Sequence, residues 1–172
     1  MRSDVLVEKW GFEGMDDKVS IGKLLNSKAQ EWAMLPEEKG VYAVIAPEGF
    51  SPEFAENVDD DWKKELEEYW VKDTNILYFG KVGKEKQKTK RTLRKRIREY
   101  IKSKLSETGN HRGGKNIWHL KNVEQLYFIW KECKACEQEE LEGELIERFK
   151  EDYKQFPFAN LKSGNKKKTS PQ

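Results

Sequence analysis

The sequence predicts a small mixed α/β domain of the α+β type, with a mostly antiparallel sheet of three strands flanked by helices. Three short apolar runs indicate buried strands, because each is bounded by loop-forming or charged residues. Two longer stretches repeat apolar residues at helical spacing, which gives the order β, β, α, β, α. The 172 residues have the length of one domain, and 6 Trp, 6 Tyr and 8 Phe provide a core despite a charged share of 37%.

The leader, residues 1–39, is expected to be an extension that packs on the domain. Four apolar residues near its middle could form a short amphipathic helix: Val19, Ile21, Leu24 and Leu25. Pro36 would end any helix before the first strand begins.

Three strands are expected in the body of the chain. The run at 41–46 lies between Gly40 and Pro47, and the second run, at 76–80, ends in a glycine. The third run covers residues 126–130. The first two strands are consecutive, so they most simply pair antiparallel.

Two main helices follow the second and third strands. The first is predicted by a stripe at intervals of four, Leu93, Ile97, Ile101 and Leu105. The second is predicted by Leu141, Leu145, Ile146 and Phe149. A shorter helix is expected between the first two strands, where Trp62, Leu66, Tyr69 and Trp70 recur at helical spacing.

The net charge of +2 conceals a strong segregation of charge along the chain. Residues 81–121 carry 15 basic and 3 acidic side chains, which is the pattern of a segment that binds a polyanion. Residues 47–73 carry 3 basic and 10 acidic side chains and form an acidic insert, expected at the surface over or beside the cleft of the domain. The remaining part, residues 161–172, is expected to be a disordered basic tail.

Each candidate functional residue also has a simpler structural interpretation. Taken alone, Tyr42 and Tyr78 are most simply core tyrosines, and Arg96 is most simply a surface arginine that covers Tyr100 one helical turn away. Glu142 borders the apolar stripe of its helix, where a carboxylate is costly unless it is paired or binds a metal.

One cysteine pair, Cys133 and Cys136, is spaced as CxxC. A zinc site needs about four ligands, and only His111 and His119 could complete one, so two ordinary thiols are the default.

Five pieces of the sequence, taken in their order along the chain, resemble the motifs of the GIY-YIG endonuclease superfamily. The matching pieces are Gly40-Val41-Tyr42, Tyr78-Phe79-Gly80-Lys81, the helix from Leu93 to Tyr100, the helix from Leu141 to Phe149, and Asn160. The resemblance covers residues 40–160 and is nearest to stand-alone bacterial members. These members carry His-x-Gly-Gly before a Trp-containing strand and end in Pro-Phe-Ala-Asn-Leu. In this chain the His-x-Gly-Gly motif is at 111–114, the Trp-containing segment at 117–118 and the final motif at 157–161.

The resemblance implies a hydrolytic site with defined roles. Tyr42 or Tyr78 would orient and deprotonate a water, with its pKa depressed by Lys81 and Arg96. Arg96 would bind the phosphate, and Glu142 would hold one Mg²⁺ or Mn²⁺. Tyr100 would complete the set of hydrogen-bonding groups in the site. Asn160 would hold the site together, and His111 is a further candidate for proton transfer or phosphate contact.

Phosphate contacts are expected from the basic segment. The candidate nucleic-acid-binding residues are Lys81, Lys84, Arg91, Arg94, Lys95, Arg98, Arg112 and Lys115. The sequence departs from the family in the length of its insert and of the loop from 81 to 96, which leaves the DNA target open.

The leading hypothesis is therefore a divalent-metal-dependent DNA endonuclease located in the cytoplasm. Two alternatives stay open: a catalytically inactive nucleic-acid-binding module and a protein-interaction domain. No apolar run approaches the length of a membrane helix, so no membrane association is expected, and a monomer and a homodimer are equally compatible with the sequence.

Overall fold

The computed structural model describes residues 9–12, 17–82, 91–105, 114–133 and 137–160. Its centre is an antiparallel sheet with the strand order β1-β4-β2-β3. The strands are β1 (Val19–Ser20), β2 (Gly40–Ile45), β3 (Ile76–Lys81) and β4 (Tyr127–Glu132). The α+β class is confirmed, but the expectation of three strands is wrong. The two-residue strand β1 pairs with Tyr127 and Phe128, and it is too short to leave a pattern in the sequence.

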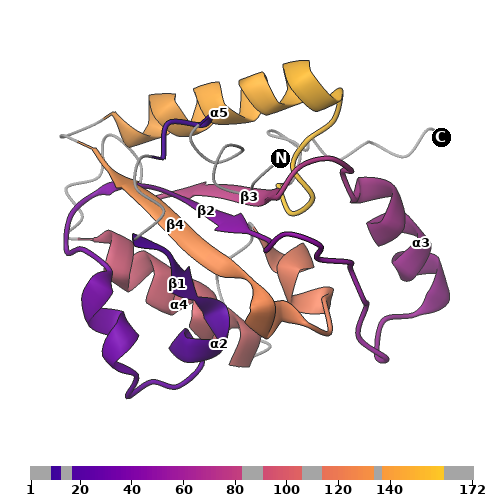
Figure 1. The fold of residues 1–172 in the computed structure, drawn as a ribbon, viewed down its shortest axis with the longest axis horizontal. Helices are drawn as coiled ribbons and strands as arrows, with labels where there is room; N and C mark the ends of the chain where they lie inside the picture. Colours follow the sequence, from indigo (N-terminus) through magenta and orange to yellow (C-terminus); the bar gives the residue numbers. More distant parts are fainter. Residues whose placement is uncertain (1–8, 13–16, 83–90, 106–113, 134–136, 161–172) are drawn as a thin grey trace, which may run out of the picture.

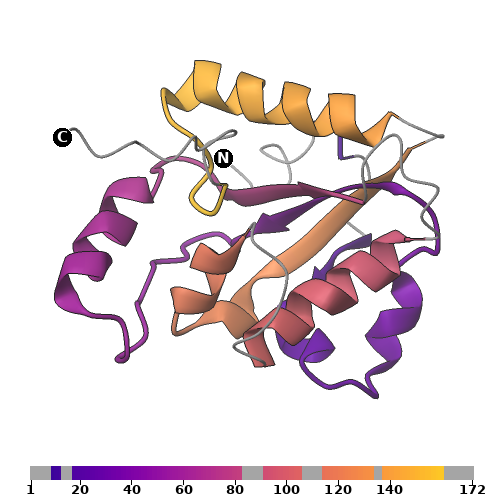
Figure 2. The same cartoon turned by 180° about the vertical axis from the view of Figure 1, so that it is seen from behind.

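The helices cover both faces of the sheet. The two long ones, α4 (Leu93–Leu105) and α5 (Gln138–Tyr153), lie on opposite sides of it (Figures 1 and 2). The shorter elements are α2 (Ile21–Leu24), α3 (Asp60–Tyr69), and the 3-10 turns η2 (Gln30–Met34), η3 (Lys115–His119) and η4 (Val123–Gln125). No helix among the described residues has both the length and the apolar character needed to cross a bilayer.

Burial on both faces explains why the first strand is a continuous apolar run. Every residue of β2 is buried, and successive side chains point to opposite faces. Tyr42 and Val44 join the core beneath α4, whereas Val41, Ala43 and Ile45 join the core beneath α5.

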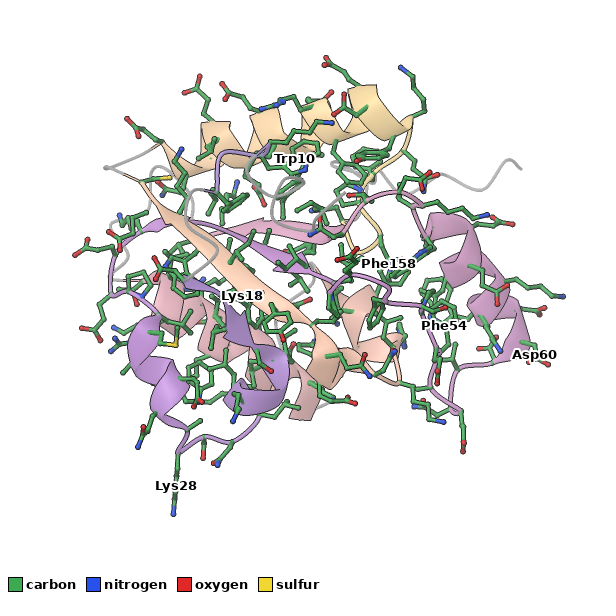
Figure 3. All side chains as sticks on the ribbon, viewed as in Figure 1. Trp10, Lys18, Lys28, Phe54, Asp60 and Phe158 are labelled. Atoms are coloured by element: carbon green, nitrogen blue, oxygen red, sulfur yellow. The ribbon has the colours of Figure 1, made fainter. Side chains whose placement is uncertain are left out.

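The leader, residues 1–39, contributes both secondary structure and core residues to the domain. It supplies β1, α2 and η2, and its Trp10 and Phe12 are buried with Phe79 and Phe149 on the α5 face (Figure 3). Val19 belongs to β1 rather than to the expected short helix, which starts at Ile21.

The long helices follow their apolar stripes. Leu93, Ile97 and Ile101 are buried on α4, while the side chain of Leu105 lies outside the described part. The amide of Lys95 donates to Thr92 Oγ1 at the start of α4, as in an N-cap. On α5 the buried residues include Leu145 and Phe149.

The acidic insert adopts the expected helix, α3. Leu66 on α3 is fully buried, and Trp62 and Trp70 pack against the core, as their spacing predicts. However, the insert joins the end of β2 to the start of β3, so it lies at the opposite end of this hairpin from Gly40 and Lys81 (Figure 1). Trp62 and Trp70 nevertheless pack against the core that contains Tyr42 and Tyr78, so the placement of the insert beside the cleft stays a prediction.

The segment expected to be a Trp-containing strand is also different. Residues Lys115–His119 form the 3-10 turn η3, which follows Gly114 in a left-handed conformation with φ of 75°. The side chain of Tyr100 leaves no room for a Cβ at Gly114, because the added atom would lie 2.5 Å from its hydroxyl oxygen.

Candidate active site

Three tyrosines from three elements form a cluster on the α4 face of the sheet. Tyr42 of β2 and Tyr78 of β3 have ring centroids 6.0 Å apart, and Tyr100 of α4 lies 5.7 Å from Tyr78 and 6.4 Å from Tyr42. All three side chains are buried. The antiparallel pairing of β2 with β3 therefore brings together residues that are 36 positions apart in the sequence.

Gly80 provides the space for this cluster. It is opposite Tyr42 in the β2–β3 ladder, and a Cβ on Gly80 would lie 2.6 Å from the Tyr42 hydroxyl oxygen. A side chain at position 80 would therefore displace the Tyr42 ring.

Arg96 extends from α4 to the tyrosine cluster. Its side chain is 24% exposed, and its Nη1 lies 3.2 Å from Glu99 Oε2. Its Nε is buried and has no hydrogen-bond partner in the described residues. A buried guanidinium N–H without a partner is costly, which indicates a site that an acceptor could occupy.

The tyrosine hydroxyls are harder to deprotonate than the sequence predicts. Burial raises the pKa of Tyr42 to about 12, although the charge of Arg96 and a hydrogen bond with Tyr78 oppose the shift. Burial also raises the pKa of Tyr78 well above its ordinary value. The expected depression of the tyrosine pKa is therefore wrong for this structure, because desolvation outweighs the neighbouring cation.

Tyr100 has a structural partner. Its hydroxyl donates to the Gly114 carbonyl oxygen at 2.6 Å, which ties α4 to the start of η3. Burial also raises the pKa of Tyr100 well above its ordinary value. The neutral hydroxyl is thus the form that this contact requires.

Glu142 projects from α5 toward the end of β3. Its Oε2 lies 3.2 Å from Lys81 Nζ, and the same ammonium lies 3.0 Å from Glu139 Oε1 one turn earlier on α5. The Glu142 side chain is only 18% exposed, and burial raises its pKa despite the neighbouring Lys81. Since Arg96 also contributes to this pKa, Glu142 lies within electrostatic reach of the tyrosine cluster.

The donor set around Glu142 suits one hard cation held by few protein ligands. No group of three or more His, Cys, Asp or Glu side chains that could hold a metal occurs within the described ranges. Mg²⁺ is commonly held by one or two carboxylates, with water and substrate phosphate as its other ligands. Glu142 fits that role, and the cation would compete with Lys81 for the carboxylate.

Asn160 holds the edge of the sheet beside the tyrosines. Its Oδ1 accepts from the Phe79 amide at 3.0 Å, and its Nδ2 donates to the Phe79 carbonyl at 2.9 Å. Because β3 is an edge strand, this side chain replaces the pairing of a neighbouring strand. The position agrees with the supporting role that the resemblance implies.

We expect Asn160→Asp to destabilise the protein by about 2 kcal/mol, since aspartate cannot donate to the Phe79 carbonyl. Urea denaturation should show this loss. Asn26→Asp is the control, because Asn26 is exposed and its Oδ1 accepts from the Lys28 amide at 3.0 Å, which an aspartate oxygen can also do. Equal stability of the two variants would contradict the edge-holding role.

The candidate phosphate-binding residues differ in their surroundings. Lys95, Arg98 and Lys115 are exposed, and Arg98 lies over the Trp32 ring. Arg91 Nε is 3.7 Å from Glu99 Oε1. Arg94 instead anchors the leader, since it binds the Leu35 carbonyl at 2.8 Å and Glu37 at 3.0 Å.

Several predicted residues lie outside the described part of the chain: Lys84, His111, Arg112 and Cys136. Cys133 is half-buried, and burial raises the pKa of its thiol. A raised pKa lowers the thiolate fraction and agrees with an ordinary thiol.

Three residues at the site were not predicted from the sequence. Glu139 shares Lys81 with Glu142, Glu99 pairs with Arg96, and Gln138 is buried with its Nε2 donating to the Val82 carbonyl at 3.2 Å. The spacing of Glu139 and Glu142 on one helical face was the available signal for the first of them. Gln138 gave none, because it connects α5 to a residue 56 positions away.

The comparisons with known proteins do not extend this picture. No family model, no curated protein and no solved structure matches the chain.

Proposed function

We propose that the protein is a divalent-metal-dependent DNA endonuclease of the GIY-YIG type. The observation that carries this proposal is the buried Arg96 Nε, which has no described partner and belongs to a side chain that contacts Tyr42. Glu142 approaches the same cluster from the other face of the sheet. Two hydroxyls, a guanidinium and a carboxylate thus converge at one end of the β2–β3 hairpin.

A phosphodiester is the group that this arrangement suits best. Guanidinium binds phosphate oxygens through its planar array of donors, and Arg96 has a donor to offer. The basic helix α4 would guide a polyanion to the site. A neutral substrate would add no counter-charge to Arg96, which already pairs with Glu99.

Each side chain then has a role in hydrolysis. Arg96 would orient the scissile phosphate, and Tyr42 and Tyr78 would position the attacking water, since their raised pKa favours the neutral hydroxyl. Glu142 would hold the metal. When bound, Mg²⁺ supplies positive charge that neutralises the phosphate and lowers the pKa of groups beside it.

A second candidate is a nucleic-acid-binding module without catalysis. It is favoured by the ion pair of Glu142 with Lys81, which occupies the proposed metal ligand, and by the raised pKa of both tyrosines. This candidate predicts DNA binding with no cleavage.

A cleavage panel separates the two candidates. Supercoiled plasmid, branched DNA and single-stranded DNA would each be incubated with the protein in Mg²⁺, in Mn²⁺ and in EDTA. Cleavage in metal alone supports the endonuclease, whereas binding without cleavage of any substrate supports the inactive module. Absence of binding would contradict both.

We expect DNA binding to weaken steeply with salt. Each phosphate neutralised should contribute about −0.9 to the slope of log affinity against log salt. Arg91→Ala, just before α4, and Lys95→Ala, in its first turn, each remove an exposed cation and should each make the slope less steep. Fluorescence anisotropy with a labelled duplex measures this.

The control for this series is Lys63→Ala on the acidic helix α3. It removes the same charge from an exposed lysine at the other end of the hairpin. An equal change of slope in Lys63→Ala would show that overall charge, rather than the α4 surface, governs binding.

A further inference from the structure

Lys81 lies between two carboxylates of α5 at the end of β3. Its Nζ is 3.0 Å from Glu139 Oε1 and 3.2 Å from Glu142 Oε2, so one ammonium pairs with both side chains. The two partners differ in exposure, because the Glu139 side chain is 43% exposed and that of Glu142 only 18%. The lysine is therefore held by one carboxylate at the surface and by another that is largely buried.

A buried side chain fixes this arrangement. Gln138, at the start of α5, is 1% exposed, and its Nε2 donates to the Val82 carbonyl at 3.2 Å. Val82 directly follows Lys81 and Gln138 directly precedes Glu139, so this hydrogen bond joins the two backbone segments that carry the ion pairs. The fold therefore sets the distance between the lysine and the two carboxylates.

A divalent cation at Glu142 would displace this ammonium. Mg²⁺ binds a carboxylate oxygen at about 2.1 Å and keeps several waters, and two cations on one partly buried carboxylate repel each other. An ammonium has three N–H donors on a flexible stem, so it can leave one partner and keep the other. Glu139 is the partner that it can keep.

A cation that bridged both carboxylates would fit the site less well. It would take both Glu139 and Glu142 from Lys81, whose side chain is only 23% exposed. The loss of both carboxylates is costly for a cation at such a position, because water can only partly replace them. Retention of the ammonium by Glu139 avoids this cost.

We propose that Glu139 is a positioning residue for metal binding, which retains the Lys81 ammonium while Glu142 holds the divalent cation. Lys81 is then an internal competitor of the metal, and Glu139 limits the strength of that competition. The inference rests on the metal site of the proposed function. It adds to that site a second carboxylate, which acts through the lysine and does not touch the metal.

The test is a Mn²⁺ titration of the full chain without DNA, with free Mn²⁺ measured by electron paramagnetic resonance. Glu142→Gln defines the binding that depends on this carboxylate. Lys81→Met removes the competing charge, and Mn²⁺ should bind about tenfold more tightly. Lys81→Arg keeps the charge and should bind Mn²⁺ as weakly as the original protein does.

Glu139→Gln tests the positioning role directly. The Lys81 ammonium then loses this alternative partner and competes more strongly for Glu142, so Mn²⁺ should bind about threefold more weakly. In the Lys81→Met background the same substitution should have little effect, because there is no ammonium to retain. An equal loss in both backgrounds would show that Glu139 acts on the metal directly and would overturn the inference.

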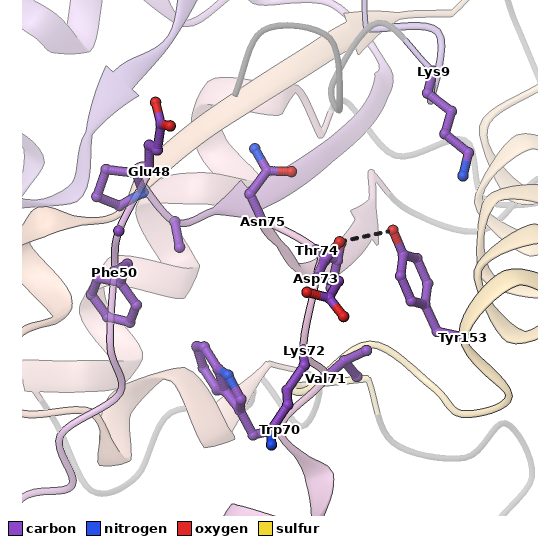
Figure 4. Close-up of a pocket in the computed structure, with 13 residues that line it drawn as sticks. Lys9, Glu48, Phe50, Trp70, Val71, Lys72, Asp73, Thr74, Asn75 and Tyr153 are labelled. Carbon is purple, nitrogen blue, oxygen red and sulfur yellow. Dashed lines mark hydrogen bonds between the residues drawn. The ribbon is translucent and has the colours of Figure 1, made fainter. Parts of the chain in front are cut away.

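Lys72→Met is the control for overall charge. Lys72 is exposed and lines a groove at the opposite end of the β2–β3 hairpin, together with Glu48 and Asp73 (Figure 4). The substitution removes the same charge beside other carboxylates and should leave the Mn²⁺ affinity unchanged. An equal gain in Lys72→Met and Lys81→Met would assign the effect to net charge and would contradict the role of Lys81.

Glu142→Gln separates the inference from the proposed function. If this variant bound Mn²⁺ as the original protein does, the metal site would be wrong, and the inference would fail with it. If binding depended on Glu142 but Lys81→Met left the affinity unchanged, the inference alone would fail.

Discussion

Glu142→Gln is expected to reduce metal-dependent DNA cleavage by a factor on the order of 10³. The substitution keeps the size of the side chain but removes the charge that a divalent cation requires. DNA binding should persist, because the basic surface of α4 is unchanged. Plasmid nicking rates over a range of Mg²⁺ concentrations, with anisotropy on the same preparation, would measure both effects.

The matched control for this prediction is Glu139→Gln. Glu139 lies one turn earlier on α5 and contacts the same Lys81 ammonium, yet it is more exposed than Glu142. We expect Glu139→Gln to change cleavage much less. Equal losses in the two variants would assign the effect to the Lys81 ion pairs rather than to a metal at Glu142.

The stability of Glu142→Gln distinguishes a functional carboxylate from a structural one. The folded protein raises the pKa of Glu142, so folding favours the protonated form. The contribution of Glu142 to stability is therefore full below its ordinary pKa of 4.5 and is lost as the pH rises through the folded value. Glutamine does not titrate, so the variant should gain in stability relative to the original protein as the pH rises above 4.5.

Thermal melts of both proteins between pH 4 and pH 8 would measure this trend. Lys81 keeps Glu139 as a partner in the variant, which limits the cost of losing the other ion pair. A variant that is less stable at neutral pH and still cleaves DNA would identify Glu142 as a structural ion-pair partner and would remove it from the active site.

Arg96→Lys is expected to lower cleavage by about 10²-fold. Lysine keeps the positive charge but offers one ammonium group in place of the planar set of guanidinium donors. It cannot present a donor at the position of the buried Nε, which has no described partner at present. Single-turnover cleavage rates at saturating protein would isolate the chemical step from binding.

Arg98→Lys on the same helix is the control, because Arg98 is exposed and lies over the Trp32 ring. It should leave the single-turnover rate nearly unchanged. If Arg96→Lys cleaved at the original rate, the geometry of the guanidinium would have no part in the reaction. A loss confined to affinity would place Arg96 in binding alone.

Much of the fold follows from local patterns in the sequence. The continuous apolar runs of β2 and β3 reflect burial on both faces, and the stripe on α4 reflects one buried face. The helix in the acidic insert is confirmed for the same reason, since Leu66 is buried. The fourth strand was missed because two residues carry no periodicity, and their pairing with β4 spans more than one hundred positions.

Local sequence patterns show which chemical groups are available and in what order they occur along the chain. The surroundings of those groups come from the tertiary structure. Strand pairing places Tyr42 beside Tyr78, and packing sets the pKa of Tyr42 near 12, which the local cations alone would have lowered. Tertiary packing also places the Arg94 guanidinium against the leader, where it donates to the Leu35 carbonyl. The reason is that burial and the partners of a polar group depend on distant segments, whereas propensity and periodicity are local.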